Sequence, residues 1–382
     1  DMGFFSFKKI KQQEASIVLD IGSASVGGSL VVVRKEEPPL MLYTKRLPIP
    51  IQQKIDEKMY TMSLYRVIEN VLADIVKNGI PRLESSEIKY AFCVYASPWF
   101  GSEAHTIHIQ KDEPIQLTER YLFNLLKNER AAFIKKLKQR EGEEVVLIEQ
   151  NIIQTLLNGY PTEAPQNKRA REVAISTFLS IVPKRLHEKV QTMVYAHVHP
   201  QEVVHHSFSL TSYRTVTDLF PADSNSCIID VSGEITDVSI VENDVITETH
   251  TFPIGRNALV RAISKGDESE YNVALTLLQS YAHGELRESE EKDIEKKIGV
   301  VLEKWFNAVS GTFSSEKTVF MTADMSALPL FVKMLEKKEQ KVVVLKEGHF
   351  ENLVEVRKGV TVDPFVMMLS YFIDRSFVND DI

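Results

Sequence analysis

The feature that most constrains this fold is a strand–aspartate–strand pattern that occurs twice in the chain. Residues 16–33 read SIVLDIGSASVGGSLVVV, in which an apolar run stops at Asp20, passes through small residues and resumes. Residues 227–255 read CIIDVSGEITDVSIVENDVITETHTFPIG and repeat this order around Asp230. Apolar runs separated by small turn residues predict β-hairpins. The repeat therefore predicts two similar lobes whose hairpin bends, each beside an aspartate, face one another.

The composition limits the classes of function. A chain of 382 residues with 43% hydrophobic and 26% charged residues is expected to fold into two or more domains. Its net charge of −8 argues against a nucleic-acid partner, because such proteins usually carry a basic face. Its two cysteines, Cys93 and Cys227, form no CxxC motif, which excludes a disulfide framework and a cysteine zinc site and fits a reducing cytoplasm.

The order of the predicted elements indicates a small α+β module inserted into a larger domain. A strand and an amphipathic helix ending at Gly79 follow the first hairpin, and an apolar strand covers 88–97. Residues 98–195 then predict a β-α-β-β-α order. Its elements are a short strand at 105–110, a helix from Thr118 to Arg140 capped by Thr118, strands at 144–153 and 171–182, and a helix at 184–195. From Asn257 to Ser314 the pattern is helical throughout.

The two hairpin bends have the features of a phosphate-binding cleft. A bend of small residues leaves backbone N–H groups open to phosphate oxygens. The donors that we expect are at Gly22, Ser23, Ser25, Ser232, Gly233 and Thr236. Asp20 and Asp230 would hold a hydrated Mg²⁺, an ion that binds through one or two carboxylates, waters and phosphates. The residues of one such bend are also those that an ordinary β-turn prefers. The prediction of a nucleotide bound between the lobes therefore depends on the presence of both hairpins.

These motifs resemble the actin-like ATPase superfamily, and within it the bacterial FtsA/PilM family. The stretch VLDIGSASVGGSLV resembles the first phosphate hairpin of the superfamily, and CIIDVSGEITDVSIVENDVI resembles the second. THTFPIGRNALVRAI is similar to the strand, turn and helix that follow in FtsA and PilM, which also insert an SHS2-type module where residues 98–195 stand. The resemblance, from Ser16 to Arg375, implies an α/β, actin-like (ribonuclease H-like) two-lobed ATPase fold with ATP and Mg²⁺ in the cleft. It adds Gly255, Thr322 and Ala323 to the expected cofactor-binding residues.

The resemblance also divides the chain into segments. They are an N-terminal amphipathic segment (1–15), the first lobe (16–97), the inserted SHS2-like module (98–195), a continuation of the first lobe (196–226), the hairpin region of the second lobe (227–262), its helical subdomain (263–314), its continuation (315–345) and a C-terminal return to the first lobe (346–382).

The sequence departs from the family pattern at two of the three loops expected to contact the nucleotide. The second hairpin reads VSGEITD where the family has three consecutive glycines, so Ser232 and Glu234 replace two of them. A carboxylate at Glu234 would oppose a triphosphate unless it points away. The adenine-side loop, rich in glycine in the family, here reads TADMS. We therefore expect a degenerate site with weak or no ATP binding and at most slow hydrolysis. Asp218 is the one candidate catalytic residue, and it matches the family pattern poorly.

Three functions are compatible with this resemblance. An FtsA-like chain would link a cell-division polymer to the cytoplasmic membrane, with self-association as a further expectation. A PilM-like chain would bind the cytoplasmic tail of a membrane pilus-assembly protein, in the cleft beside the inserted module. A chain of a different class would be a sugar-kinase-like ATPase, although we find no sugar pocket. For a scaffold on the inner face of the membrane, the expected lipid-contacting residues are Phe4, Phe5, Phe7, Lys8 and Lys9, although a tail packed on the protein body is the simpler reading.

Overall fold

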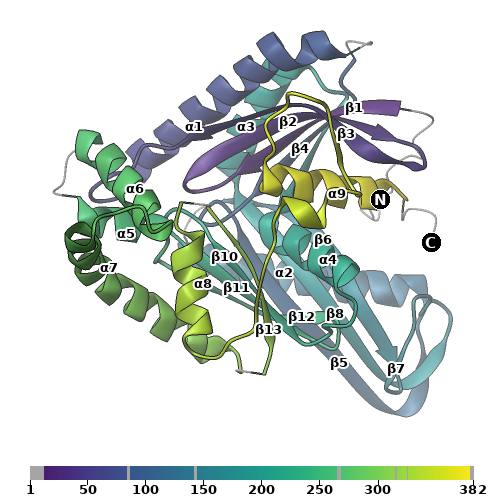
Figure 1. The fold of residues 1–382 in the computed structure, drawn as a ribbon. Helices are drawn as coiled ribbons and strands as arrows, with labels where there is room; N and C mark the ends of the chain where they lie inside the picture. Colours follow the sequence, from purple (N-terminus) through teal and green to yellow (C-terminus); the bar gives the residue numbers. More distant parts are fainter. Residues whose placement is uncertain are drawn as a thin grey trace.

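The computed structural model describes residues 13–83, 87–141, 144–264, 268–314, 316–324 and 326–378, which form three β-sheets with helices around them (Figure 1). The first sheet has six strands in the order β15-β3-β2-β1-β4-β9, the second has five in the order β12-β11-β10-β13-β14, and the third has four in the order β5-β8-β6-β7. The expected lipid-contacting residues, Phe4 to Lys9, lie outside the described residues. Within the described part of the chain, no helix is long and apolar enough to cross a membrane.

The first lobe is a sheet covered by helices on both faces. Its strands are β1 (Gln13–Ile21), β2 (Ser25–Arg34), β3 (Glu37–Pro48), β4 (Tyr90–Tyr95), β9 (Glu202–Ser207) and β15 (Glu355–Val356). Side chains alternate along a strand. Ile17 and Leu19 of β1 therefore pack toward α1 (Glu57–Asp74) and α3 (Lys184–Val198), whereas Val18 packs toward α4 (Phe208–Leu219) and α9 (Pro364–Val378). Burial of both faces explains why β1 reads as an almost continuous apolar run.

The second lobe repeats the connectivity of the first. Its strands are β10 (Ser226–Val231), β11 (Thr236–Glu242), β12 (Val245–Phe252), β13 (Thr318–Ala323) and β14 (Val342–Val344). β10 is antiparallel to β11 and parallel to β13, as β1 is antiparallel to β2 and parallel to β4. The helices α5 (Arg256–Ile263), α6 (Glu268–Ala282), α7 (Glu288–Val309) and α8 (Leu328–Glu336) pack on this sheet around the fully buried Trp305. The sequence repeat is therefore also a repeat of structure.

The third sheet is formed by the inserted residues. Its elements are β5 (Gly101–Gln116), α2 (Glu119–Glu141), β6 (Val145–Leu157), β7 (Tyr160–Pro161) and β8 (Arg169–Pro183). Thr118 caps α2 as predicted, because its hydroxyl accepts a hydrogen bond from the backbone N–H of Tyr121 at 3.2 Å. The prediction of a short strand at 105–110 was wrong: β5 has 16 residues. Its polar KDEP stretch reads as a turn, yet β5 continues to pair with the apolar β8 across a register shift between Gln110 and Ile115.

A buried carboxylate joins the third sheet to the first lobe. Glu149 of β6 accepts hydrogen bonds from the hydroxyl of Ser207 at 2.6 Å and from its backbone N–H at 3.1 Å, both on β9. It also accepts from the hydroxyl of Ser180 on β8, at 2.5 Å, and contacts Nδ1 of His206 at 2.9 Å. At the opposite edge of the module, β5 lies against β12 of the second lobe. The inserted sheet therefore contacts both lobes.

Candidate functional site: a closed cleft between two hairpins

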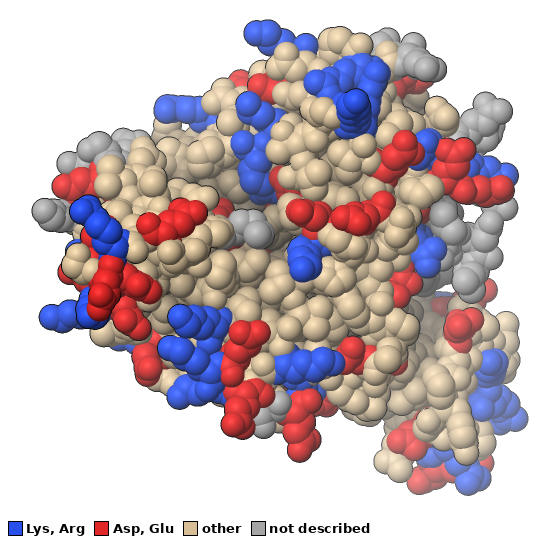
Figure 2. All heavy atoms as spheres, viewed as in Figure 1, with Lys and Arg blue, Asp and Glu red and all other residues tan. Residues whose placement is uncertain are grey.

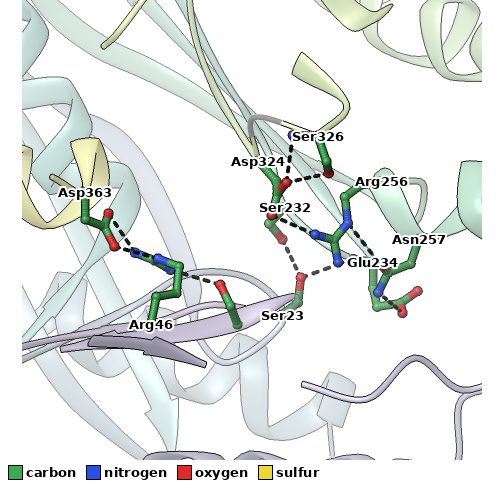
Figure 3. A network of polar contacts seen from close by, with 10 residues as sticks. Ser23, Arg46, Ser232, Glu234, Arg256, Asn257, Asp324, Ser326 and Asp363 are labelled. Carbon is green, nitrogen blue, oxygen red and sulfur yellow. Dashed lines mark hydrogen bonds and ion pairs between the residues drawn. The ribbon is translucent and has the colours of Figure 1, made fainter. Parts of the chain in front are cut away.

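The bends of the two hairpins meet directly. The Oγ atoms of Ser23 and Ser232 lie 2.5 Å apart, and the backbone N–H of Glu234 donates to Ser23 Oγ at 3.1 Å (Figure 3). Gly233 makes this approach possible, because a Cβ there would lie 2.8 Å from the backbone of Ala24. The two bends thus face each other, as the repeat predicts, but they touch.

The contact leaves little room between the lobes. A cavity of about 50 Å³ remains, whereas ligand pockets typically have roughly 300–1,000 Å³. Of the predicted cofactor-binding residues, those that line this cavity are Asp20, Gly22, Ser23, Ser25, Asp230 and Ser232. The structure brings together the core of the predicted site, in a conformation that is too closed for a nucleotide.

Two aromatic side chains brace the first bend. Tyr60 of α1 donates its hydroxyl to the carbonyl of Ser23 at 2.5 Å, and Trp99 donates its indole N–H to the carbonyl of Gly22 at 2.8 Å. The two rings are stacked, with centroids 5.1 Å apart. The position of the bend is therefore fixed from outside the hairpin.

An arginine that the sequence analysis did not identify neutralises the first aspartate. Arg46 of β3 donates from Nη2 to Asp20 at 2.7 Å and from Nε to Asp363 at 2.7 Å (Figure 3). Its Nη1 donates to the hydroxyl of Ser25 at 2.9 Å. Asp363 lies 317 residues from Arg46 along the chain, so no local pattern signals the pair. The one local signal is that Arg46 lies within the predicted strand MLYTKRLPI, where a cationic side chain is unexpected if the strand is buried.

Glu234 points away from the cavity. Its carboxylate pairs with both terminal nitrogens of Arg261, at 2.6 and 2.7 Å, and accepts from the amide of Asn257 at 2.8 Å. Arg261 also donates to the carbonyl of Gln52, which belongs to the connection after β3 in the first lobe. The residue that departs from the family pattern is therefore neutralised by an arginine, and together they link the two lobes.

The second aspartate is held without a cation. Thr322 donates to Asp230 at 2.7 Å, and burial raises the pKa of Asp230 to about 8 despite this hydrogen bond. Burial also raises the pKa of Asp20, although Arg46 opposes the shift. Metal ligands must be deprotonated. Because Asp20 is paired with the cation of Arg46, this pair does not fit the predicted Mg²⁺ site in this arrangement, and in the described ranges no three His, Cys, Asp or Glu side chains gather as metal ligands would.

The remaining predicted residues lie outside the cavity. Thr236 accepts from the indole N–H of Trp305 at 2.9 Å and donates to the carbonyl of Ile254. Gly255 lies beneath the second bend, where a Cβ would be 2.5 Å from the carbonyl oxygen of Ser232. Ala323 is buried on β13. Asp218 accepts from Tyr371 and Arg375 of α9, so its hydrogen bonds join α4 to α9 and do not reach the cleft.

A much larger hollow lies on the inserted module. It has a volume of about 980 Å³ and runs between α2, the middle of β6 and the loop after β7. Its lining residues are Glu119, Leu122, Phe123, Leu126, Ile152, Ile153, Gln154, Thr155, residues 161–166, Lys168 and Ile175. We call this hollow the module groove. β7 pairs with β6 only at Leu156 and Leu157, so in the described part of the chain the outer side of the middle of β6 has no strand partner.

Comparison with known proteins supports the fold. No protein-family model matches the sequence, and no curated protein matches it. Among solved structures, a chain of the PilM-PilN type IV pilus biogenesis complex matches with a TM-score of 0.62 and 11% identity, over 97% of this chain and 99% of that chain. Ethanolamine utilization protein EutJ from Carboxydothermus hydrogenoformans matches with a TM-score of 0.47 and 13% identity, over 95% of this chain and 90% of that chain. The predicted actin-like ATPase fold is confirmed.

Proposed function

We propose that this protein is an assembly scaffold of the PilM type, which binds a short cytoplasmic segment of a membrane protein in the module groove at the inner face of the cytoplasmic membrane. One contrast carries the proposal: the cleft between the lobes has about 50 Å³, whereas the module groove has about 980 Å³ and is open. The structural likeness to a chain of the PilM-PilN type IV pilus biogenesis complex supports this choice, because that chain belongs to a complex of proteins.

The walls of the module groove suit an extended peptide. Leu122, Phe123 and Leu126 of α2 form one apolar wall, and Ile152 and Ile153 of β6 form the other. Phe123 is 41% exposed, so its ring adds accessible apolar surface to the first wall. A strand edge that lacks a partner can bind a peptide through main-chain hydrogen bonds, while pockets for alternate side chains give specificity. We therefore infer an occupant with apolar residues at alternate positions.

The rim of the module groove indicates the charge of that peptide. Glu119 and Glu163 are exposed at the rim, whereas the ammonium group of Lys168 is bound to the hydroxyl of Thr162 at 2.6 Å. Opposite charges across an interface increase the association rate and fix the orientation of the partner. A basic residue next to the apolar positions would complement the two carboxylates.

The other candidate functions have less support. In FtsA the subdomain that corresponds to residues 257–314 combines helices with a small sheet, whereas residues 256–264 and 268–314 of this chain contain helices and no strand. An FtsA-like link to a division polymer, with self-association, thus stays a prediction, as does binding of ATP and Mg²⁺. A sugar-kinase-like enzyme needs space between the lobes, which the touching hairpins do not leave.

Titration calorimetry with a synthetic peptide tests the proposal. The peptide is the cytoplasmic segment of a membrane pilus-assembly protein from the same organism. We expect the full chain to bind it and Phe123→Asp to weaken binding at least tenfold. Val300→Asp, at a valine of the second lobe that is also exposed (60%), is the control and should bind normally. Lack of binding by the unmodified chain, or equal binding by Phe123→Asp, would refute the proposal. Pelleting with a division polymer instead would favour the FtsA-type role.

A further inference from the structure

Two buried carboxylates of the first lobe share one guanidinium. Asp20 is 4% exposed and Asp363 is 7% exposed, and each lies 2.7 Å from a nitrogen of Arg46. Asp20 is the next-to-last residue of β1, whereas Asp363 precedes α9 and also accepts from the backbone N–H groups of Phe365 and Val366, at 3.1 and 3.2 Å. Without a cation between them, two buried carboxylates would repel each other and one would have to be protonated. Arg46 therefore holds the first hairpin and the start of α9 together.

The backbone is adapted to this guanidinium. A Cβ at position 27 would lie 2.5 Å from Nη2 of Arg46 and 2.8 Å from its Cζ, so the glycine at this position of β2 opens the space that the guanidinium fills. The ring of Phe365 lies 5.2 Å from Cζ on another side. The surrounding residues therefore leave a space that fits the guanidinium of Arg46. The ring of Phe365 attracts this cation in addition to the ion pairs.

The other carboxylates at the cavity are also engaged. Asp324 is bound to Arg256 at 2.7 Å, and Asp230 accepts from Thr322. Together with Asp20 they are the three carboxylates among the cavity-lining residues. Each of these carboxyl groups therefore already has at least one oxygen bound to a guanidinium or a hydroxyl. Arg46 and Arg256 thus already supply positive charge beside Asp20 and Asp324.

We propose that Arg46 is a built-in counter-cation that takes the place of a divalent metal ion in this cleft, so that the closed arrangement of the hairpins requires no metal. This inference is independent of the proposed function, because it concerns the first lobe and the hairpins and does not involve the module groove. It predicts that removing the guanidinium creates a divalent-cation site between Asp20 and Asp363.

Thermal unfolding with and without Mg²⁺ tests this proposal. The unmodified chain should have the same melting temperature in EDTA and in millimolar Mg²⁺. Arg46→Ala should melt at a lower temperature in EDTA and recover part of the loss in Mg²⁺, because the metal then neutralises the two carboxylates. Arg46→Lys keeps a cation and should stay insensitive to Mg²⁺. The matched control is Arg34→Ala, since Arg34 of β2 pairs with Glu355 at 2.6 Å but outside the cleft, and this variant should not respond to Mg²⁺.

Two further measurements keep the test decisive if Arg46→Ala does not fold. Gly27→Ala retains the arginine but displaces its guanidinium, so it should gain part of the same response to Mg²⁺. Direct Mn²⁺ titration, followed by electron paramagnetic resonance, should detect no binding to the unmodified chain at the cleft. Binding that Asp20→Asn abolishes would overturn the proposal. So would a folded Arg46→Ala variant that shows no Mn²⁺ binding either.

Discussion

At the scale of single residues, the cleft differs most from a metal-dependent site in the protonation of Asp230. Thr322 gives this carboxyl group one hydrogen bond, and no cation is bound to it among the described residues. Burial raises its pKa to about 8 from the ordinary value of 3.8. A neutral acid at this position avoids the repulsion from Asp20 that a second carboxylate would feel. The charge state of one side chain thus helps to keep the lobes in contact.

This protonation predicts how stability depends on pH. The folded state holds the proton of Asp230 up to about pH 8, whereas the unfolded chain releases it near pH 4, so the folded state binds more protons in between. The free energy of unfolding should therefore fall by about 4 kcal/mol between pH 5 and pH 8 through this group. Asp230→Asn keeps the acceptor for Thr322 and should lose that part of the dependence. Thermal unfolding at both pH values measures it, and parallel profiles for the two proteins would contradict the assignment.

At the scale of elements, the hairpins were predictable because their pattern is local. The apolar run, the aspartate and the small residues occur within one stretch of the chain, and so does the capping threonine of α2. The pairs Arg46–Asp363 and Glu234–Arg261 were not predictable, since nothing local indicates which of several arginines reaches each carboxylate. For the same reason, the sequence alone suggests that Glu234 would repel a phosphate group. Nothing near Glu234 in the chain shows that Arg261 pairs with its carboxylate. The segment boundaries derived from the family resemblance stay predictions.

The contact between the hairpins gives a prediction for two glycines. Gly233→Ala places a Cβ 2.8 Å from the backbone of Ala24, which is in the other lobe and cannot move like a flexible side chain. We expect a loss of about 1–3 kcal/mol in the free energy of unfolding. Gly299 lies within α7 with nothing within 4 Å of an added Cβ, so Gly299→Ala should stabilise the chain by about 0.5–1 kcal/mol. Denaturant titration of both variants checks the opposite signs, and equal effects would argue against a tight hairpin contact.

The link between Glu234, Arg261 and Gln52 gives a second prediction at this scale. Arg261→Ala leaves the carboxylate of Glu234, which is 6% exposed, with Asn257 as its remaining partner. Removing one partner of a buried ion pair typically costs about 3–5 kcal/mol. Arg287, which pairs with Glu290 on the surface, is the control, and its replacement by alanine should change little. Denaturant titration that finds similar small losses for both variants would show that Glu234 is solvated in solution.

At the scale of the whole molecule, the cleft between the lobes and the module groove lie in different parts of the protein. The cleft between the lobes is closed by direct contacts, whereas the module groove lies on the inserted sheet and is open. On the face shown in Figure 2, acidic and basic side chains are interspersed over the second lobe and form no broad basic surface there. We therefore expect the proposed peptide to bind without a cycle of nucleotide binding and lobe closure.

A disulfide across the cleft tests that separation. Because the Oγ atoms of Ser23 and Ser232 lie 2.5 Å apart, cysteines at both positions should form a disulfide under mild oxidation, and the native Cys93 and Cys227 are buried and should not compete. The oxidised Ser23→Cys/Ser232→Cys variant should bind the membrane-protein peptide as the reduced form does, measured by calorimetry, because the module groove does not include the cleft. It should bind no Mg·ATP, since the lobes cannot part. Slow or absent disulfide formation would mean that the lobes are apart in solution, and a loss of peptide binding on oxidation would mean that the groove depends on lobe movement.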